Sequence, residues 1–123
     1  MADLTKSIAG LNSAVDVTSN AGAASQTIVC NRGDEKVIIR MSNADAATAL
    51  VTFVGNGFGA PTAVEATLEQ NDVKVIQLES NRVKAPSTQK ITATVTDADG
   101  TAYSGTVTNV AFEVLEAFKS LVD

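Results

Sequence analysis

The chain has 123 residues, 45% of them hydrophobic, and this length fits one domain with its own core better than two. Nine Lys and Arg against 14 Asp and Glu leave a net charge of −5, and the basic residues do not cluster, so binding to nucleic acid or to an anionic membrane surface is not expected. There is no histidine, which excludes Ser-His-Asp, Cys-His and His-based zinc chemistry.

Cysteine usage and the N-terminus bear on the cellular compartment. Cys30 is the only cysteine, so no internal disulfide can form, and we expect it to act as a small buried hydrophobic residue. The N-terminus lacks the apolar block of a signal peptide, and no stretch approaches the ~18 apolar residues of a membrane helix. The sequence therefore predicts a protein that is made and kept in the cytoplasm.

The first 25 residues are interpreted as an N-terminal arm, a short helix followed by an extended segment. Leu4, Ile8 and Leu11 recur at spacings of four and three, the stripe of a very short amphipathic helix. Such a helix is marginal alone and needs a surface to dock on. The following residues are rich in Ser, Ala, Asn and Gly, with residues 14–18 as the strand candidate of the arm.

Residues 26–115 have the pattern of a β-sandwich domain. Short runs rich in Val, Ile and Thr are separated by turn residues about every ten positions, and no long helical pattern separates them. The fold class predicted is all-β: an antiparallel β-sandwich or small barrel of about 7–8 short strands, with short terminal arm or helix segments. The expected strands are 26–30, 36–42, 50–54, 64–68, 72–78, 90–96 and 106–114.

Two of these strands alternate clearly between an apolar and a more polar side, which predicts their core-facing residues. The five residues 31–35, with Gly33 in the middle, have the length of a hairpin loop, so the strands 26–30 and 36–42 are expected to pair with each other. The expected core-facing residues of the two alternating strands are Val37, Ile39, Met41, Ile91, Ala93 and Val95.

The spacing of the apolar residues changes from a strand pattern to a helical pattern near the C-terminus. Ala111, Leu115, Phe118 and Val122 fall on a helical stripe, after a strand whose Val110, Phe112 and Val114 share one side. Residues 116–123 are therefore expected to form an apolar tail or a short helix.

Several short motifs resemble reactive or binding loops. The glycine-rich residues 55–59 lack the Gly-Lys-Ser/Thr ending of a phosphate-binding loop, so we interpret them as a connection, with Phe58 capping the core or exposed as a contact. Residues 97–100 match only the start of a calcium loop and are expected to form a turn. Residues 32–34 are Arg-Gly-Asp, but Gly-Asp also suits an ordinary turn.

No catalytic constellation follows from these motifs. A pair of carboxylates could perform glycosidase chemistry, but the acids lie at turns and strand ends, where structural or solubilising roles are expected. We therefore predict no enzyme, no cofactor and no metal. The candidate interface residues are apolar groups on the terminal segments and in the glycine loop, which pack either on their own sandwich or on a neighbouring subunit: Leu4, Ile8, Leu11, Phe58, Leu115, Phe118 and Leu121.

Three motifs follow one another between residues 36 and 84: KVIIR with a small polar continuation, VTFV leading into Gly-Asn-Gly, and VKVIQLES closing with NRVK. This succession resembles the small β-sandwich decoration proteins of tailed bacteriophages, also called cement or auxiliary head proteins. The resemblance covers half of the chain. The C-terminal extension 116–123 has no counterpart in that pattern.

The resemblance implies a non-enzymatic virion structural protein without a cofactor. Such proteins decorate and stabilise the outer surface of a capsid by bridging capsid subunits, so the expected partners are the major capsid protein and further copies of the chain, commonly as a homotrimer. The N-terminal arm often reaches across subunits in this family, which gives Leu4, Ile8 and Leu11 a role. The expected location is the capsid outer surface, after synthesis in the host cytoplasm.

Two alternatives remain open from the sequence. Tail and head-completion components of phages are also small, β-rich and acidic. A sugar-binding or host-binding β-sandwich module would use the glycine loop and residues 32–34 as its binding loops.

Overall fold

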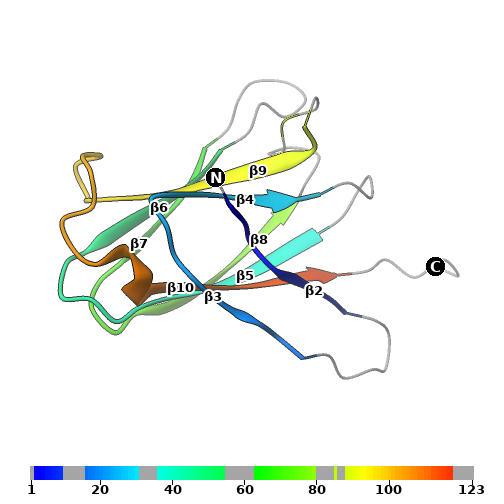
Figure 1. Ribbon diagram of the computed structural model, residues 1–123, viewed down its shortest axis with the longest axis horizontal. Coiled ribbons are helices and arrows are strands. Elements are labelled where there is room, and N and C mark those ends of the chain that lie inside the picture. Colours follow the sequence, from blue (N-terminus) through cyan, green and yellow to red (C-terminus); the bar gives the residue numbers. More distant parts are fainter. Residues whose placement is uncertain are drawn as a thin grey trace, which may run out of the picture.

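The computed structural model describes residues 2–9, 16–30, 36–54, 63–79, 85 and 88–117. Two sheets pack face to face in this part of the chain, so the predicted all-β sandwich is confirmed (Figure 1). The elements are β1 (Ala2–Asp3), β2 (Lys6–Ala9), β3 (Ser19–Ala21), β4 (Ser25–Val29), β5 (Lys36–Asn43), β6 (Ala49–Val54), β7 (Val64–Leu68), β8 (Val73–Glu79), β9 (Lys90–Thr96), a 3-10 turn η1 (Val107–Asn109) and β10 (Val110–Ala117).

The strand order is that of a jelly roll. Sheet A has the order β1-β4-β9-β6-β7, and sheet B has the order β2-β10-β5-β8, with β3 also paired to β10. Without the first two short strands, the sheets are β4-β9-β6-β7 and β3-β10-β5-β8, and every neighbouring pair is antiparallel. The chain changes sheet at each connection from β3 to β10 except the one between β6 and β7. This arrangement is the double Greek key that defines the jelly roll.

The core lies between the sheets and is built by alternation along the strands. Phe53 of sheet A and Phe112 of sheet B are its largest side chains, and both are 0% exposed. Burying a large apolar side chain contributes about 1.5–3 kcal/mol, so these two residues are major contributors to stability. Cys30 is also fully buried, as predicted. All six predicted core-facing residues of β5 and β9 are buried, which confirms the alternation.

The predicted hairpin between the first two domain strands is wrong. β4 lies in sheet A beside β9, whereas β5 lies in sheet B between β10 and β8. A short polar connection with glycine is compatible both with a hairpin and with a crossing between two packed sheets. The choice depends on long-range pairing, which the local pattern does not contain.

The N-terminal arm forms strands where a helix was expected. β1 pairs in parallel with β4 of sheet A, and β2 pairs in parallel with β10 of sheet B (Figure 1). Between them Leu4 enters the core, 8% exposed, and its N–H donates to the Thr27 carbonyl at 2.8 Å. The helix prediction is wrong because two sheet edges offer this segment backbone hydrogen bonds that a short isolated helix could not match.

The rest of the described arm also differs from the prediction. Residues 16–18 are not a strand, and the strand of this segment is β3, which pairs antiparallel with β10. Residues 14 and 15 lie outside the described part. The arm therefore closes one side of the sandwich, because β2 and β3 share the edge of β10 that β5 does not occupy.

The expected change to a helical period does not occur within the described residues. β10 runs to Ala117 and pairs along its whole length with β5. Strand neighbours on both edges of β10 hold it extended through Leu115 and Glu116. Residues 118–123, the remainder of the predicted tail, lie outside the described part.

Candidate interaction surface

Neither of two hollows on the surface has the composition of a catalytic site. They have volumes of about 210 and 220 Å³. Within the ranges that the structure describes, no three Cys, Asp or Glu side chains gather as a metal site would require. The hydrogen bonds and ion pairs of the lining residues indicate whether each hollow is part of the framework of the fold or a candidate binding surface.

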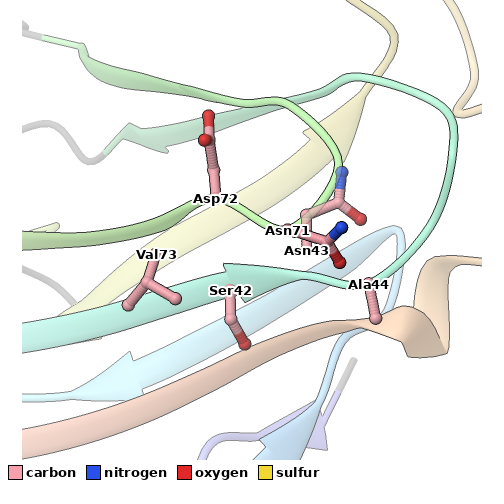
Figure 2. A pocket seen from close by; sticks show the side chains of 6 residues that line it. All are labelled: Ser42, Asn43, Ala44, Asn71, Asp72 and Val73. Carbon is pink, nitrogen blue, oxygen red and sulfur yellow. The ribbon is translucent and has the colours of Figure 1, made fainter.

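The first hollow lies where β5 ends and β8 begins and is lined by Ser42, Asn43, Ala44, Asn71, Asp72 and Val73 (Figure 2). Asn43 is 1% exposed, and its Nδ2 donates to the carbonyls of Ala47 and Leu68 at 2.9 and 3.1 Å. Its Oδ1 accepts from the Asp45 N–H at 2.9 Å. The Asn43 side-chain amide therefore bonds to backbone groups of three separate residues near strand ends, and we assign this hollow a structural role.

A second set of hydrogen bonds fixes the same end of the sandwich. The Asp45 carboxylate accepts from the N–H groups of Ala47 and Thr106 at 3.0 and 2.9 Å and from Asn109 Nδ2 at 3.1 Å. These bonds lower the pKa of Asp45. The Tyr103 hydroxyl donates to the Ala47 carbonyl at 2.7 Å, and burial raises the pKa of that phenol. The network ties the β5–β6 connection to the β9–β10 connection.

The loop that resembled the start of a calcium site forms the predicted turn. Gly100 has φ +87°, and its N–H donates to the Asp97 carbonyl at 2.9 Å. Asp97 Oδ1 accepts from the Ser104 N–H and hydroxyl at 2.9 and 3.0 Å. Asp99 Oδ1 accepts from the Thr101 hydroxyl and N–H at 2.6 and 3.0 Å, which lowers the pKa of Asp99. Both carboxylates therefore stabilise the turn itself.

The second hollow lies on the outer face of sheet B and differs in character. Val73 and Val75, which are 52% and 64% exposed, lie on the edge strand β8 beside Ser42 and Arg40 of β5. Exposed apolar side chains that lie next to one another are the feature by which this face is a candidate interaction surface. By register, the described side chains of this face are Val73, Val75, Gln77, Lys36, Ile38, Arg40, Ser42, Ala111, Glu113, Leu115, Ser19, Ala21 and Ser7.

The centre of this face is neutral. Arg40 Nη1 lies 2.5 Å from Glu113 Oε1, and both side chains line the hollow of about 220 Å³ with Val17, Ile38, Val75 and Leu115. The two side chains are 49% and 29% exposed, so the pair contributes at most about 1 kcal/mol to stability. Its main effect is to cancel charge in the middle of this face.

The outer face of sheet A carries hydroxyl groups instead. By register it presents threonines from four neighbouring strands together with Val29, Leu50 and Val54, but these three apolar side chains are half-buried and therefore less exposed than Val73 and Val75 of sheet B. The interaction surface indicated by the structure is therefore the outer face of sheet B. The threonines in question are Thr27, Thr52, Thr67, Thr92, Thr94 and Thr96.

The predicted interface residues have different positions in the structure. Leu4 lies in the core, Ile8 is 38% exposed on β2, and Leu115 is half-buried and lines the hollow on sheet B. The others, namely Leu11, Phe58, Phe118 and Leu121, lie outside the described residues.

Sequence reasoning missed Val73, Val75 and Ile38. β8 has apolar residues on both of its sides, so the exposed side is identified only by its register with β5.

Comparisons with models of protein families, with curated proteins and with solved structures find no match for the chain. In the part of the chain that the structure describes, no helix has the length and apolar character needed to span a membrane.

Proposed function

We propose that the protein is a non-enzymatic structural protein of a virion, which binds the outer surface of a tailed-phage capsid and stabilises it by bridging capsid subunits. The observation that supports an assembly role is the outer face of sheet B. It exposes Val73 and Val75 around the neutral Arg40–Glu113 pair, on a chain with a net charge of −5. Interface centres are depleted of net charge and enriched in apolar area.

The fold is compatible with this role and with one rival. Jelly rolls occur in viral capsid domains and in lectins, so the architecture alone does not decide between them. Sugar sites usually present an exposed aromatic ring. Among the described aromatic residues, Phe53 and Phe112 are fully buried and Tyr103 is bonded to the Ala47 carbonyl, so these three do not support a sugar site. The capsid as partner comes from the resemblance of residues 36–84.

Stabilisation would follow from mass action. A protein that binds the assembled lattice and not its separated subunits lowers the free energy of the lattice by about 2.7 kcal/mol per site at a concentration 100 times its Kd. A rigid sandwich serves this purpose, since β1 and β2 link its two sheets along one side. No catalytic group is needed.

The test is co-sedimentation with mature capsids that lack the protein, from a tailed phage whose genome encodes the chain. The proposal expects saturable binding, and it expects no further uptake by capsids that already carry a full complement. A protein that stays in the supernatant at all concentrations would contradict the proposal. Binding to immobilised glycans without capsid binding would support the lectin rival.

A further inference from the structure

The outer face of sheet B has a self-complementary pattern about the line between β5 and β10. Three of the four residues of β5 on this face are paired in register with a residue of β10 that has matching size or opposite charge, and the fourth, Lys36, is paired with Ala117. A basic residue lies beside an acidic one, a large apolar residue beside another, and a hydroxymethyl group beside a methyl group. The three pairs are Arg40 with Glu113, Ile38 with Leu115, and Ser42 with Ala111.

We propose that this face binds the same face of a second copy of the chain, related by a two-fold axis that runs along the strands between β5 and β10. This rotation exchanges the positions of β5 and β10, so it places Arg40 opposite Glu113 of the partner subunit. It also places Ile38 opposite Leu115 of the partner subunit. An isologous contact requires such self-complementarity. The inference rests on the assembly role proposed above. It assigns this face to a second copy, leaves contact with the capsid to other surfaces, and differs from the homotrimer that the resemblance implies.

Charge favours a second copy at this face over contact elsewhere on the surface. The chain carries −5, so two copies repel each other in general. Here the Arg40–Glu113 pairs of the two copies would form an alternating arrangement of four charges, in which each carboxylate has a guanidinium on either side. At one margin of the face the Ser7 hydroxyl donates to the Asp16 carbonyl at 2.7 Å, and Val17, 45% exposed, lines the hollow, so residues 16 and 17 would take part in the contact.

The size of the face indicates a weak dimer. Four strand columns about 4.8 Å apart and about seven residues long at about 3.4 Å per residue give a flat area of roughly 450 Å² per copy. The pair would bury roughly 900 Å², below the ~1,200–2,000 Å² of stable complexes. The rotation also keeps the acidic turns that contain Asp45 and Asp97 at the same end of the pair, which opposes association. The dimer should therefore dissociate on dilution.

Sedimentation equilibrium of the free protein tests this inference without any capsid. The wild-type mass should rise with concentration from 12.7 kDa toward twice that value. Arg40→Glu and Glu113→Arg should each remain monomeric, because each places like charges opposite one another. Their equimolar mixture should regain the dimer mass, because complementary charges then face each other in trans. Thr67→Glu, on the outer face of sheet A, is the matched control and should dimerise like wild type.

A structural role of Arg40 and Glu113 within one chain would not produce association only in the mixture, so that result is specific to the interface. Circular dichroism of each variant establishes that it is folded. A wild-type protein that is monomeric or trimeric at high concentration would overturn the proposal, and so would a mixture that stays monomeric. These outcomes are independent of co-sedimentation with capsids, so failure of one proposal is distinguishable from failure of the other.

Discussion

A buried ion pair joins the N-terminal arm to the last strand. Lys6 Nζ lies 3.3 Å from Glu116 Oε1 and 2.5 Å from the Val29 carbonyl oxygen. The Lys6 side chain is 17% exposed and that of Glu116 is 0% exposed. The pair therefore connects β2, β4 and β10 across the side of the sandwich that the arm closes.

Replacing Lys6 with Met keeps most of the apolar stem and removes the ammonium group. Glu116 then remains buried without this partner, and breaking a buried pair in this way costs about 3–5 kcal/mol. The partial exposure of Lys6 lets water compensate in part, so we expect a loss of about 2–4 kcal/mol. The double variant Lys6→Met/Glu116→Leu removes both charges and should lie within about 1 kcal/mol of the wild type.

Urea unfolding, followed by far-UV circular dichroism, measures these differences in the free energy of unfolding. They are obtained from the shift of the urea midpoint, provided that the dependence of the free energy on urea concentration has the same slope in every variant. Lys6→Met should also accelerate amide hydrogen exchange relative to the wild type, and this acceleration should be larger at β2 than at β9, which lies in the middle of sheet A. A loss below about 0.5 kcal/mol in the single variant would refute the reasoning. Strictly additive losses in the double variant would refute the coupling between the two charges.

Three further predictions concern the loop end of the sandwich. Asn43→Ala leaves two backbone carbonyls and one N–H without their buried partner and should lower the free energy of unfolding by about 2–4 kcal/mol, measured by urea unfolding. Gly22→Ala should destabilise by about 1–3 kcal/mol in thermal unfolding, because the new Cβ would lie 2.5 Å from the Val110 carbonyl oxygen. The pKa of Asp45 is lowered in the folded state, so its contribution to stability is present above the unfolded pKa and is lost as the pH falls through the folded pKa. Asp45→Asn should therefore show a smaller loss of stability on acidification than wild type in urea unfolding at a series of acidic pH values.

The core of the sandwich could be predicted from the sequence, because alternation is a local property. Val37, Ile39 and Met41 follow one another at every second position, and this pattern places them on one side of any strand. The sheet to which each strand belongs could not be predicted. The jelly-roll order depends on which strands become neighbours in each sheet, and this is decided by pairing between distant parts of the chain. The length of the loop between β4 and β5 suits a hairpin and a crossing between the two sheets equally well.

The strands of the arm and the exposed valines of the interaction surface were missed for a related physical reason. The spacing of Leu4 and Ile8 fits a helix in isolation, but the free edges of β4 and β10 exist only once the sheets have formed. Val73 and Val75 are apolar residues on the solvent side of β8, and only their register with β5 shows this. Removing the arm would take away three paired strands, β1, β2 and β3, so such a deletion tests folding before it tests binding to a capsid.

The central claim is that the protein stabilises a capsid by binding to it, and thermal release of DNA from capsids measures this directly. Mature capsids that lack the protein are heated with increasing amounts of it, and released DNA is detected with a dye that does not enter intact capsids. Stabilisation by mass action predicts a release temperature that rises with concentration and reaches a plateau when the binding sites are full. A release temperature that does not change, at concentrations where co-sedimentation shows full occupancy, would contradict the claim.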